Sequence, residues 1–245
     1  MSRMRRLVRR ASSNWPARWR TECTNAAAGG SIGSNRNWSQ FPCAIYACGT
    51  SPKRIAAHLM AVGRLQAGDV LVEDDFNEER GICEYTVITH DNLTPGIFSK
   101  IAGVMTSQGL QILDAQIITR QDGVVVDTFQ VSDPDHAGVP PVERRASVAE
   151  TIISCVERAR RGGRAVDEPE TPAFPPVAGC PPPARRPRCR SITRSCDRST
   201  IIDVFADDTQ GLLYRHHPVV SLDLDLSVHA AQDFACRRSS IRWLM

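Results

Sequence analysis

The chain has 245 residues and a net charge of +3 at pH 7, and its length suits one or two domains of ~100–200 residues each. No apolar run approaches the ~20 residues of a transmembrane helix, and the cytoplasm is therefore the expected location. Nine cysteines are present, but an odd number without a Cys-x-x-Cys pair predicts neither a complete disulfide framework nor a zinc site.

Charge is distributed unevenly along the chain. Residues 1–50 carry a net charge of +7 and residues 51–135 one of −7. Residues 1–50 form a basic leader with little periodicity, which we expect to be disordered. Residues 51–80 are predicted to hold a short helix that begins at Pro52, followed by an acidic linker.

Residues 81–163 are the one segment in which strand period, helix period and turn chemistry agree with one another. Residues 84–90 alternate as a strand does. Thr94 then suits the N-cap of a helix and Pro95 its first position, and Gly109 can supply the left-handed residue that ends this helix.

Two strands and a second helix complete this segment. Residues 110–119 and 124–131 alternate on either side of Asp122-Gly123, a dipeptide typical of tight hairpin turns. Residues 142–156 carry an apolar stripe at helical spacing. The order βαββα is one strand short of the ferredoxin-like βαββαβ unit, an α+β fold with two helices on one face of an antiparallel sheet. The alternation predicts strands that are half-exposed.

The remainder of the chain is less regular. Residues 164–196 are rich in proline, arginine and cysteine and are predicted to be a disordered linker. Residues 197–245 hold a weak internal repeat of the helix start at Thr94. Pro218 would interrupt the repeated helix at a cost of ~3 kcal/mol, so we expect an incomplete second domain. A damaged reading frame, intact only over about residues 51–160 and briefly near 197–214, would explain this pattern, and a genuine linker is the alternative.

Several motifs carry a family resemblance. The segment from Asp91 to Phe98, the segment from Gly109 to Ala115, and the motif Asp127-Thr128-Phe129 together resemble an ACT domain. More narrowly, they are similar to the first of two ACT domains at the C-terminal end of the bacterial PII-protein uridylyltransferase/uridylyl-removing enzyme. Residues 52–59 resemble the helix before that domain, and residues 197–213 resemble the opening of the second ACT domain.

The resemblance implies an amino-acid effector, glutamine, bound at the loop between the first strand and the first helix. The N-terminus of a helix attracts a carboxylate, and Gly96 allows a ligand to approach closely. Asp114 would meet the ammonium group of the ligand across the sheet or a dimer seam. The predicted ligand-binding residues are Asp91, Asn92, Thr94, Pro95, Gly96, Ile97 and Asp114, with Asp207, Gly211 and Leu212 in the second domain. A structural role is the alternative, in which Asp91 and Asn92 only shape the turn and Asp114 only bonds a strand end.

No catalytic residue is predicted. The family that the chain resembles adds and removes uridylyl groups through two other domains, which use Mg²⁺ and UTP. Nucleotidyl transfer needs a Gly-Ser followed closely by Asp-x-Asp, and no acidic residue occurs from residue 23 to 68. His90-Asp91 suits a strand end and a turn. We therefore expect no metal and no cofactor in this chain, and contact with the PII protein only through catalytic domains outside it.

The resemblance also bears on partners. ACT domains commonly associate in pairs, so a homodimer is expected. The alternative to a sensor is a non-sensing interaction module or the product of a pseudogene. RNA binding is disfavoured, because Phe129 is the only aromatic residue on the predicted central strands and the segment is acidic.

Overall fold

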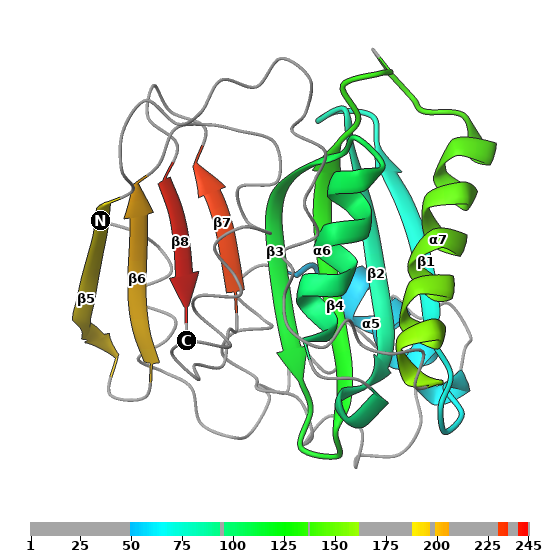
Figure 1. The fold of residues 1–245 in the computed structure, drawn as a ribbon, viewed down its shortest axis with the longest axis horizontal. Helices are drawn as coiled ribbons and strands as arrows, with labels where there is room; N and C mark the ends of the chain where they lie inside the picture. Colours follow the sequence, from blue (N-terminus) through cyan, green and yellow to red (C-terminus); the bar gives the residue numbers. More distant parts are fainter. Residues whose placement is uncertain are drawn as a thin grey trace.

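The structure, a computed structural model, describes residues 50–93, 96–136, 138–161, 188–196, 199–205, 230–234 and 240–244, the last four segments by their backbone alone. Its elements are α5 (Pro52–Arg64), β1 (Leu71–Asn77), β2 (Ile82–His90), the 3-10 helix η1 (Asp91–Leu93), α6 (Ile97–Ser107), β3 (Gln111–Thr119), β4 (Val124–Ser132), α7 (Val142–Arg160), β5 (Arg188–Cys196), β6 (Ser199–Phe205), β7 (Ala230–Phe234) and β8 (Ser240–Leu244). The eight strands form one antiparallel sheet in the order β1-β2-β4-β3-β7-β8-β6-β5 (Figure 1).

The predicted βαββα order is confirmed as β2-α6-β3-β4-α7. The hairpin between β3 and β4 turns at Gly123, whose φ is +78°, a conformation that favours glycine. The amide of Arg120 donates to the carbonyl of Val124 across this turn at 2.8 Å. Helix α6 begins later than predicted, because the chain first forms η1 and the N-cap is Gly96, in the left-handed conformation.

The acidic segment predicted to be part of a linker contains an edge strand, β1. It pairs with β2 from Leu71 opposite Ile88 to Asn77 opposite Ile82. Strand β1 therefore occupies the edge beside β2 and completes a four-stranded sheet with β2, β4 and β3. The prediction missed it because β1 carries the charges of Glu73, Asp74 and Asp75, which are common on edge strands, where they oppose pairing with other chains.

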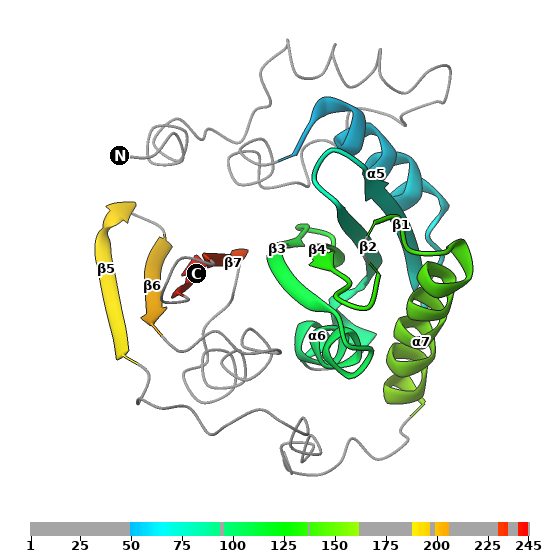
Figure 2. The same ribbon diagram turned by 90° about the horizontal axis from the view of Figure 1, so that it is seen from above.

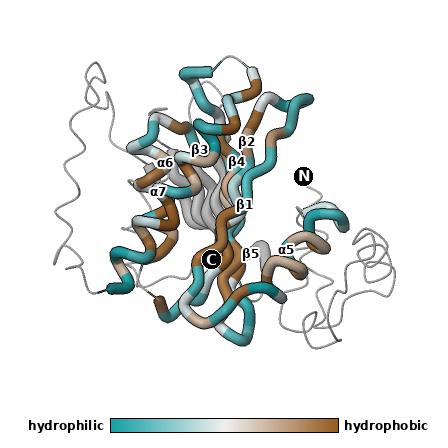
Figure 3. Tube along the Cα trace, turned by 90° about the vertical axis from the view of Figure 1, so that its right-hand side faces the viewer, coloured by the Kyte–Doolittle hydropathy of each residue, from teal (hydrophilic) through white to brown (hydrophobic). Residues whose placement is uncertain are grey.

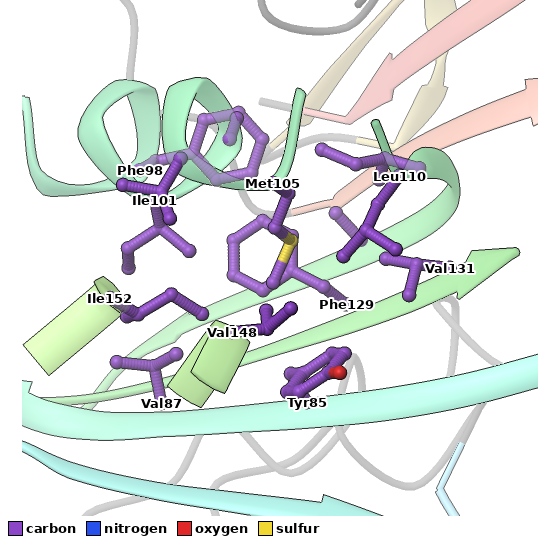
Figure 4. Close-up of a cluster of buried hydrophobic side chains, with 14 of the residues drawn as sticks. Tyr85, Val87, Phe98, Ile101, Met105, Leu110, Phe129, Val131, Val148 and Ile152 are labelled. Carbon is purple, nitrogen blue, oxygen red and sulfur yellow. The ribbon is translucent and has the colours of Figure 1, made fainter. Parts of the chain in front are cut away.

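Helices cover both faces of this four-stranded sheet. On one face, α6 and α7 bury an apolar cluster that includes Tyr85, Phe129 and Ile152 (Figure 4). On the other face, α5 packs through Ile55 and Leu59 against β2, β3 and β4, so that the sheet lies between α5 and the other two helices (Figures 2 and 3).

Because helices cover both faces of the sheet, the expectation of half-exposed strands is wrong. Every residue of β2 from Ile82 to Thr89 is buried, because the side chains that alternate toward the second face meet α5 rather than water. The strand still contains Glu84 and Thr86 on that face, because Arg54 of α5 pairs with Glu84 and His58 of α5 lies beside the hydroxyl of Thr86. Among the described residues, none of the helices is both long and apolar enough to cross a membrane.

The outer half of the sheet repeats the inner half in reverse order. The order β1-β2-β4-β3 is followed by β7-β8-β6-β5. The strand pairs β3–β4 and β7–β8, which come later in the sequence of each half, lie near the centre of the sheet, and the earlier pairs β1–β2 and β5–β6 lie at its two edges. The halves join where β3 pairs with β7, from Asp114 opposite Gln232 to Gln116 opposite Ala230.

Two expectations about the C-terminal part therefore need correction. Strand β5 (Arg188–Cys196) lies within the predicted disordered linker. Strand β8 (Ser240–Leu244) lies after Gln232, where the incomplete second domain was expected to have no sequence left for its last strands. Strand pairing uses backbone hydrogen bonds, so β5 can form beside β6 without the apolar period that the prediction required. Residues 164–187, 197–198, 206–229, 235–239 and 245 of the predicted linker and second domain lie outside the described residues.

Candidate functional site

The turn between β2 and α6 holds most of the predicted site residues that the structure describes. Asp91 and Asn92 are exposed residues of η1. The backbone amide of Asp91 donates to the carbonyl of Gly123 at 2.9 Å, which fixes the turn against the β3–β4 hairpin. A Cβ on Gly123 would stand 3.0 Å from Oδ1 of Asp91, so the close contact itself depends on glycine.

Among the residues that the structure describes, the N-terminus of α6 has neither a side-chain cap nor an acid in its first turn. Gly96, with φ 64° and ψ 36°, offers no side-chain cap, and the first turn contains no acidic residue. Lys100 lies beside this end, with its Nζ atom 3.9 Å from the place where a Cβ on Gly96 would be. Burial lowers the pKa of Lys100, an effect that Cys155 opposes. The positive end of the helix dipole and a nearby ammonium group together suit an anion such as a carboxylate.

Ile97 begins α6 and lies in the apolar core with 9% of its surface exposed. It therefore anchors the first turn of the helix to the sheet, which holds the backbone of Gly96 in place. Thr94 and Pro95 lie outside the described residues, as do Asp207, Gly211 and Leu212 of the predicted second domain. The described turn thus brings together Asp91, Asn92, Gly96 and Ile97.

Asp114 lies apart from this turn. It sits near the beginning of β3, opposite Gln130 of β4 and Gln232 of β7, whereas the turn adjoins the far end of β3 at the hairpin. By strand alternation Asp114 shares the sheet face of Ile118, which α5 covers, and α6 covers the other face. Burial raises the pKa of Asp114 to about 6, and the charge of Arg80 opposes this rise.

Sequence reasoning missed a buried acid, Asp127 in the middle of β4. Only 1% of its surface is exposed, and its cross-strand neighbours are Val87 on β2 and Ile117 on β3. Within the described part of the chain, neither carboxylate oxygen has a hydrogen-bond partner of normal geometry. Burial raises the pKa of Asp127 to about 8, although the backbone amide of Ile118 favours the ionised form. The sequence signal that could have revealed this burial is the position of Asp127 directly after the apolar run Val124-Val125-Val126.

The polar layer beneath α5 is a second concentration of titratable groups. Arg54 pairs with Glu84, and Nε2 of His58 lies 3.4 Å from the hydroxyl of Thr86. Burial and the charge of Arg54 lower the pKa of His58 to about 3, so its ring is neutral at pH 7. In the described ranges, no three or more His, Cys, Asp or Glu side chains come together as a metal site would require.

Comparison with known proteins gives a consistent set of relatives. No protein-family model matches the chain. A protein of Erythrobacter litoralis named bifunctional uridylyltransferase/uridylyl-removing enzyme is 34% identical over 156 residues, or 63% of this chain and 16% of that protein. The protein of the same name from Bradyrhizobium diazoefficiens is 32% identical over 184 residues, or 74% of this chain and 19% of that protein.

A third relative shows a higher identity over a shorter match. The bifunctional uridylyltransferase/uridylyl-removing enzyme of Rhodospirillum rubrum is 42% identical over 83 residues, which are 34% of this chain and 9% of that enzyme. The chain spans less than one fifth of the length of each of these relatives. Over more than half of its own length, the chain is homologous to one part of proteins named bifunctional uridylyltransferase/uridylyl-removing enzyme.

Proposed function

We propose that this chain is the amino-acid-sensing regulatory part of a uridylyltransferase/uridylyl-removing enzyme, and that its effector is glutamine. The observation that carries the proposal is the N-terminus of α6, which is uncapped by any side chain at Gly96 and has no acid in its first turn. The homology to named uridylyltransferases supports the nitrogen-related effector, and the resemblance to an ACT domain supports the position of the site.

The turn has the chemistry that an amino acid needs. The α-carboxylate would bind at the positive end of α6, next to the ammonium group of Lys100. Gly96 adds no side chain over this end, which leaves room for the ligand. The fixed position of η1 against Gly123 makes the approach to the helix specific. We assign no catalytic step to the described residues; transfer or removal of a uridylyl group on the PII protein would belong to other domains.

The outer half of the sheet is proposed to be a second unit of the same kind. Its strand order mirrors the inner half, and β6 ends at Phe205, immediately before the segment with Asp207, Gly211 and Leu212. A second effector site would follow β6 as the first follows β2. The two units would form a pair within one chain across the β3–β7 seam, so that an expected homodimer would need another surface.

Isothermal titration calorimetry on the full 245-residue chain tests the proposal. Glutamine, glutamate, asparagine and a panel of other amino acids would be titrated separately. Saturable heat with glutamine, and much weaker heat with the others, is the expected result. Absence of heat with every amino acid would contradict sensing and leave an interaction module as the better description.

Two glycine variants locate the site. Gly96→Ala and Gly81→Ala both place an alanine at a positive φ, 64° and 61° respectively, and neither Cβ would meet an atom closer than 3.9 Å. The two changes therefore cost similar backbone strain. We expect Gly96→Ala to weaken glutamine binding at least tenfold and Gly81→Ala, in the β1–β2 turn, to leave it unchanged. Equal effects would place the site elsewhere.

A further inference from the structure

We infer that Asp127 is the acidic anchor of the effector site and accepts hydrogen bonds from the α-ammonium group of the bound amino acid. This inference rests on the proposed function, which places the carboxylate of the ligand at the N-terminus of α6; the inference adds the residue that binds the ammonium group of the same ligand. It differs from the prediction that Asp114 meets the ammonium group.

The position of Asp127 follows from an aromatic contact. Phe98, in the first turn of α6, stacks on Phe129 of β4 with ring centroids 5.4 Å apart (Figure 4). Asp127 lies two residues before Phe129 and therefore on the same face of β4, about 7 Å nearer to the beginning of the strand. That beginning lies beside His90, where the chain leaves β2 for η1 and α6. Asp127 is thus placed below the N-terminal end of α6.

The chemistry of Asp127 distinguishes it from other acids of the chain. The buried acid Glu84 is paired with Arg54 and accepts from the amide of Gln130 at 3.4 Å. Asp133 accepts from Arg144 at 3.1 Å. Neither oxygen of Asp127 has such a partner among the described residues, although only 1% of its surface is exposed. A buried acceptor without a donor destabilises the free protein, and a ligand that brings donors removes that cost.

An amino acid supplies the missing donors. Its ammonium group carries three N–H donors, and its carboxylate lies only one carbon away, so both groups can bind between the end of α6 and the strand below it. The titratable groups on the elements that pack on this face include Lys100 on α6, Cys155 on α7, and Cys83 and Tyr85 on β2. Arg144 and Arg145 of α7 also act on this face, but they pair with Asp133 and with Asp74 of β1. Lys100 is the cation that lies beside the N-terminus of α6, where the carboxylate would bind.

Proton exchange provides a signature that a purely structural acid would not give. Because burial keeps Asp127 protonated in the free protein at pH 7, an incoming ammonium group displaces that proton, which passes to the buffer. Titrations at pH 7 in two buffers of different ionisation enthalpy are expected to report release of close to one proton for each glutamine bound. The Asp127→Asn variant has no such proton to release.

The test compares glutamine with glutaramic acid, the same molecule without its α-amino group, by calorimetry on the full chain. The wild type is expected to bind glutaramic acid at least tenfold more weakly than glutamine. Asp127→Asn is expected to bind glutamine at least tenfold more weakly and to lose the preference between the two ligands. The matched variant Asp114→Asn, which changes a partly buried acid on the opposite face whose pKa burial also raises, is expected to behave as the wild type.

The outcomes separate this inference from the proposed function. Glutamine binding by Asp127→Asn at wild-type affinity overturns the role of Asp127 and leaves the proposed function standing, whereas a wild type that binds no amino acid overturns both. If Asp127→Asn fails to fold, the wild-type comparison decides: equal affinity for glutamine and glutaramic acid overturns the inference.

Discussion

His58 gives the protein a stability that depends on pH. Burial and the charge of Arg54 lower its pKa in the folded chain to about 3, from an ordinary value of 6.5. Below pH 6.5 the unfolded chain therefore binds a proton that the folded chain does not, and stability falls as the pH falls from 6.5 toward 3. We predict that His58→Gln loses about 2 kcal/mol less than the wild type between pH 7 and pH 5.

Urea denaturation at the two pH values measures this difference. His136→Gln is the control, because the side chain of His136 is 33% exposed and lies outside the layer under α5. The same pH dependence in wild type and His58→Gln would show that α5 does not hold His58 in a buried site.

Asp127 acts on stability in the opposite direction. Its folded pKa is raised to about 8 from 3.8, so the folded chain binds the extra proton and stability falls as the pH rises from about 4 to 8. We predict that Asp127→Asn is more stable than the wild type at pH 8, by about 1–3 kcal/mol, because an uncharged amide replaces an unpaired buried acid.

Thermal unfolding at pH 5 and pH 8 checks the prediction, with Asp114→Asn for comparison. The pKa of Asp114 is raised to about 6, so its loss of stability with rising pH ends about one unit above pH 6, whereas that of Asp127 continues to about pH 8. Asp114→Asn should therefore gain less stability relative to the wild type between pH 5 and pH 8 than Asp127→Asn does. A stability gain for Asp127→Asn that is the same at pH 5 and pH 8 would contradict a pKa near 8.

At the level of single elements, α7 offers two neighbouring isoleucines with different surroundings. Ile152 is fully buried in the cluster under α6 and α7, whereas Ile153 is only partly buried at its edge. We predict that Ile152→Ala destabilises the protein by about 2–5 kcal/mol, since it leaves a cavity, and that Ile153→Ala costs less than half as much. Urea denaturation measures both, and equal losses would mean that α7 presents a different face to the sheet.

The elements also show what sequence patterns can and cannot predict. The segments from β2 to α7 were predictable, because each has its own period and its own turn signal, such as Asp122-Gly123. The edge strands β1 and β5 were missed, since their formation depends on a partner strand rather than on an apolar period. The burial of Asp127 was missed for a related reason: it depends on α6 and on neighbours from two other strands.

On the scale of the whole molecule, the inner half of the sheet has its own hydrophobic core. Both described apolar clusters draw their residues from positions 55 to 156. The outer half meets this unit through three paired positions of β3 and β7. Backbone pairing at a seam of this size stabilises the edge of β3 more than it stabilises the core, so the two halves should respond differently to a change in β7.

Ala231→Pro tests this division. Ala231 lies at the centre of the seam, paired with Ala115 of β3 and Trp243 of β8, and proline removes its N–H donor from an interior strand. We predict faster hydrogen exchange in β3 and β8, while β2 and β4 keep their protection because their partners are unchanged. Ala231→Val keeps the N–H group and serves as the matched control. Loss of protection throughout β2 and β4 would show that the inner half depends on the outer half for its stability, and unchanged exchange in β3 would show that β7 is not its neighbour.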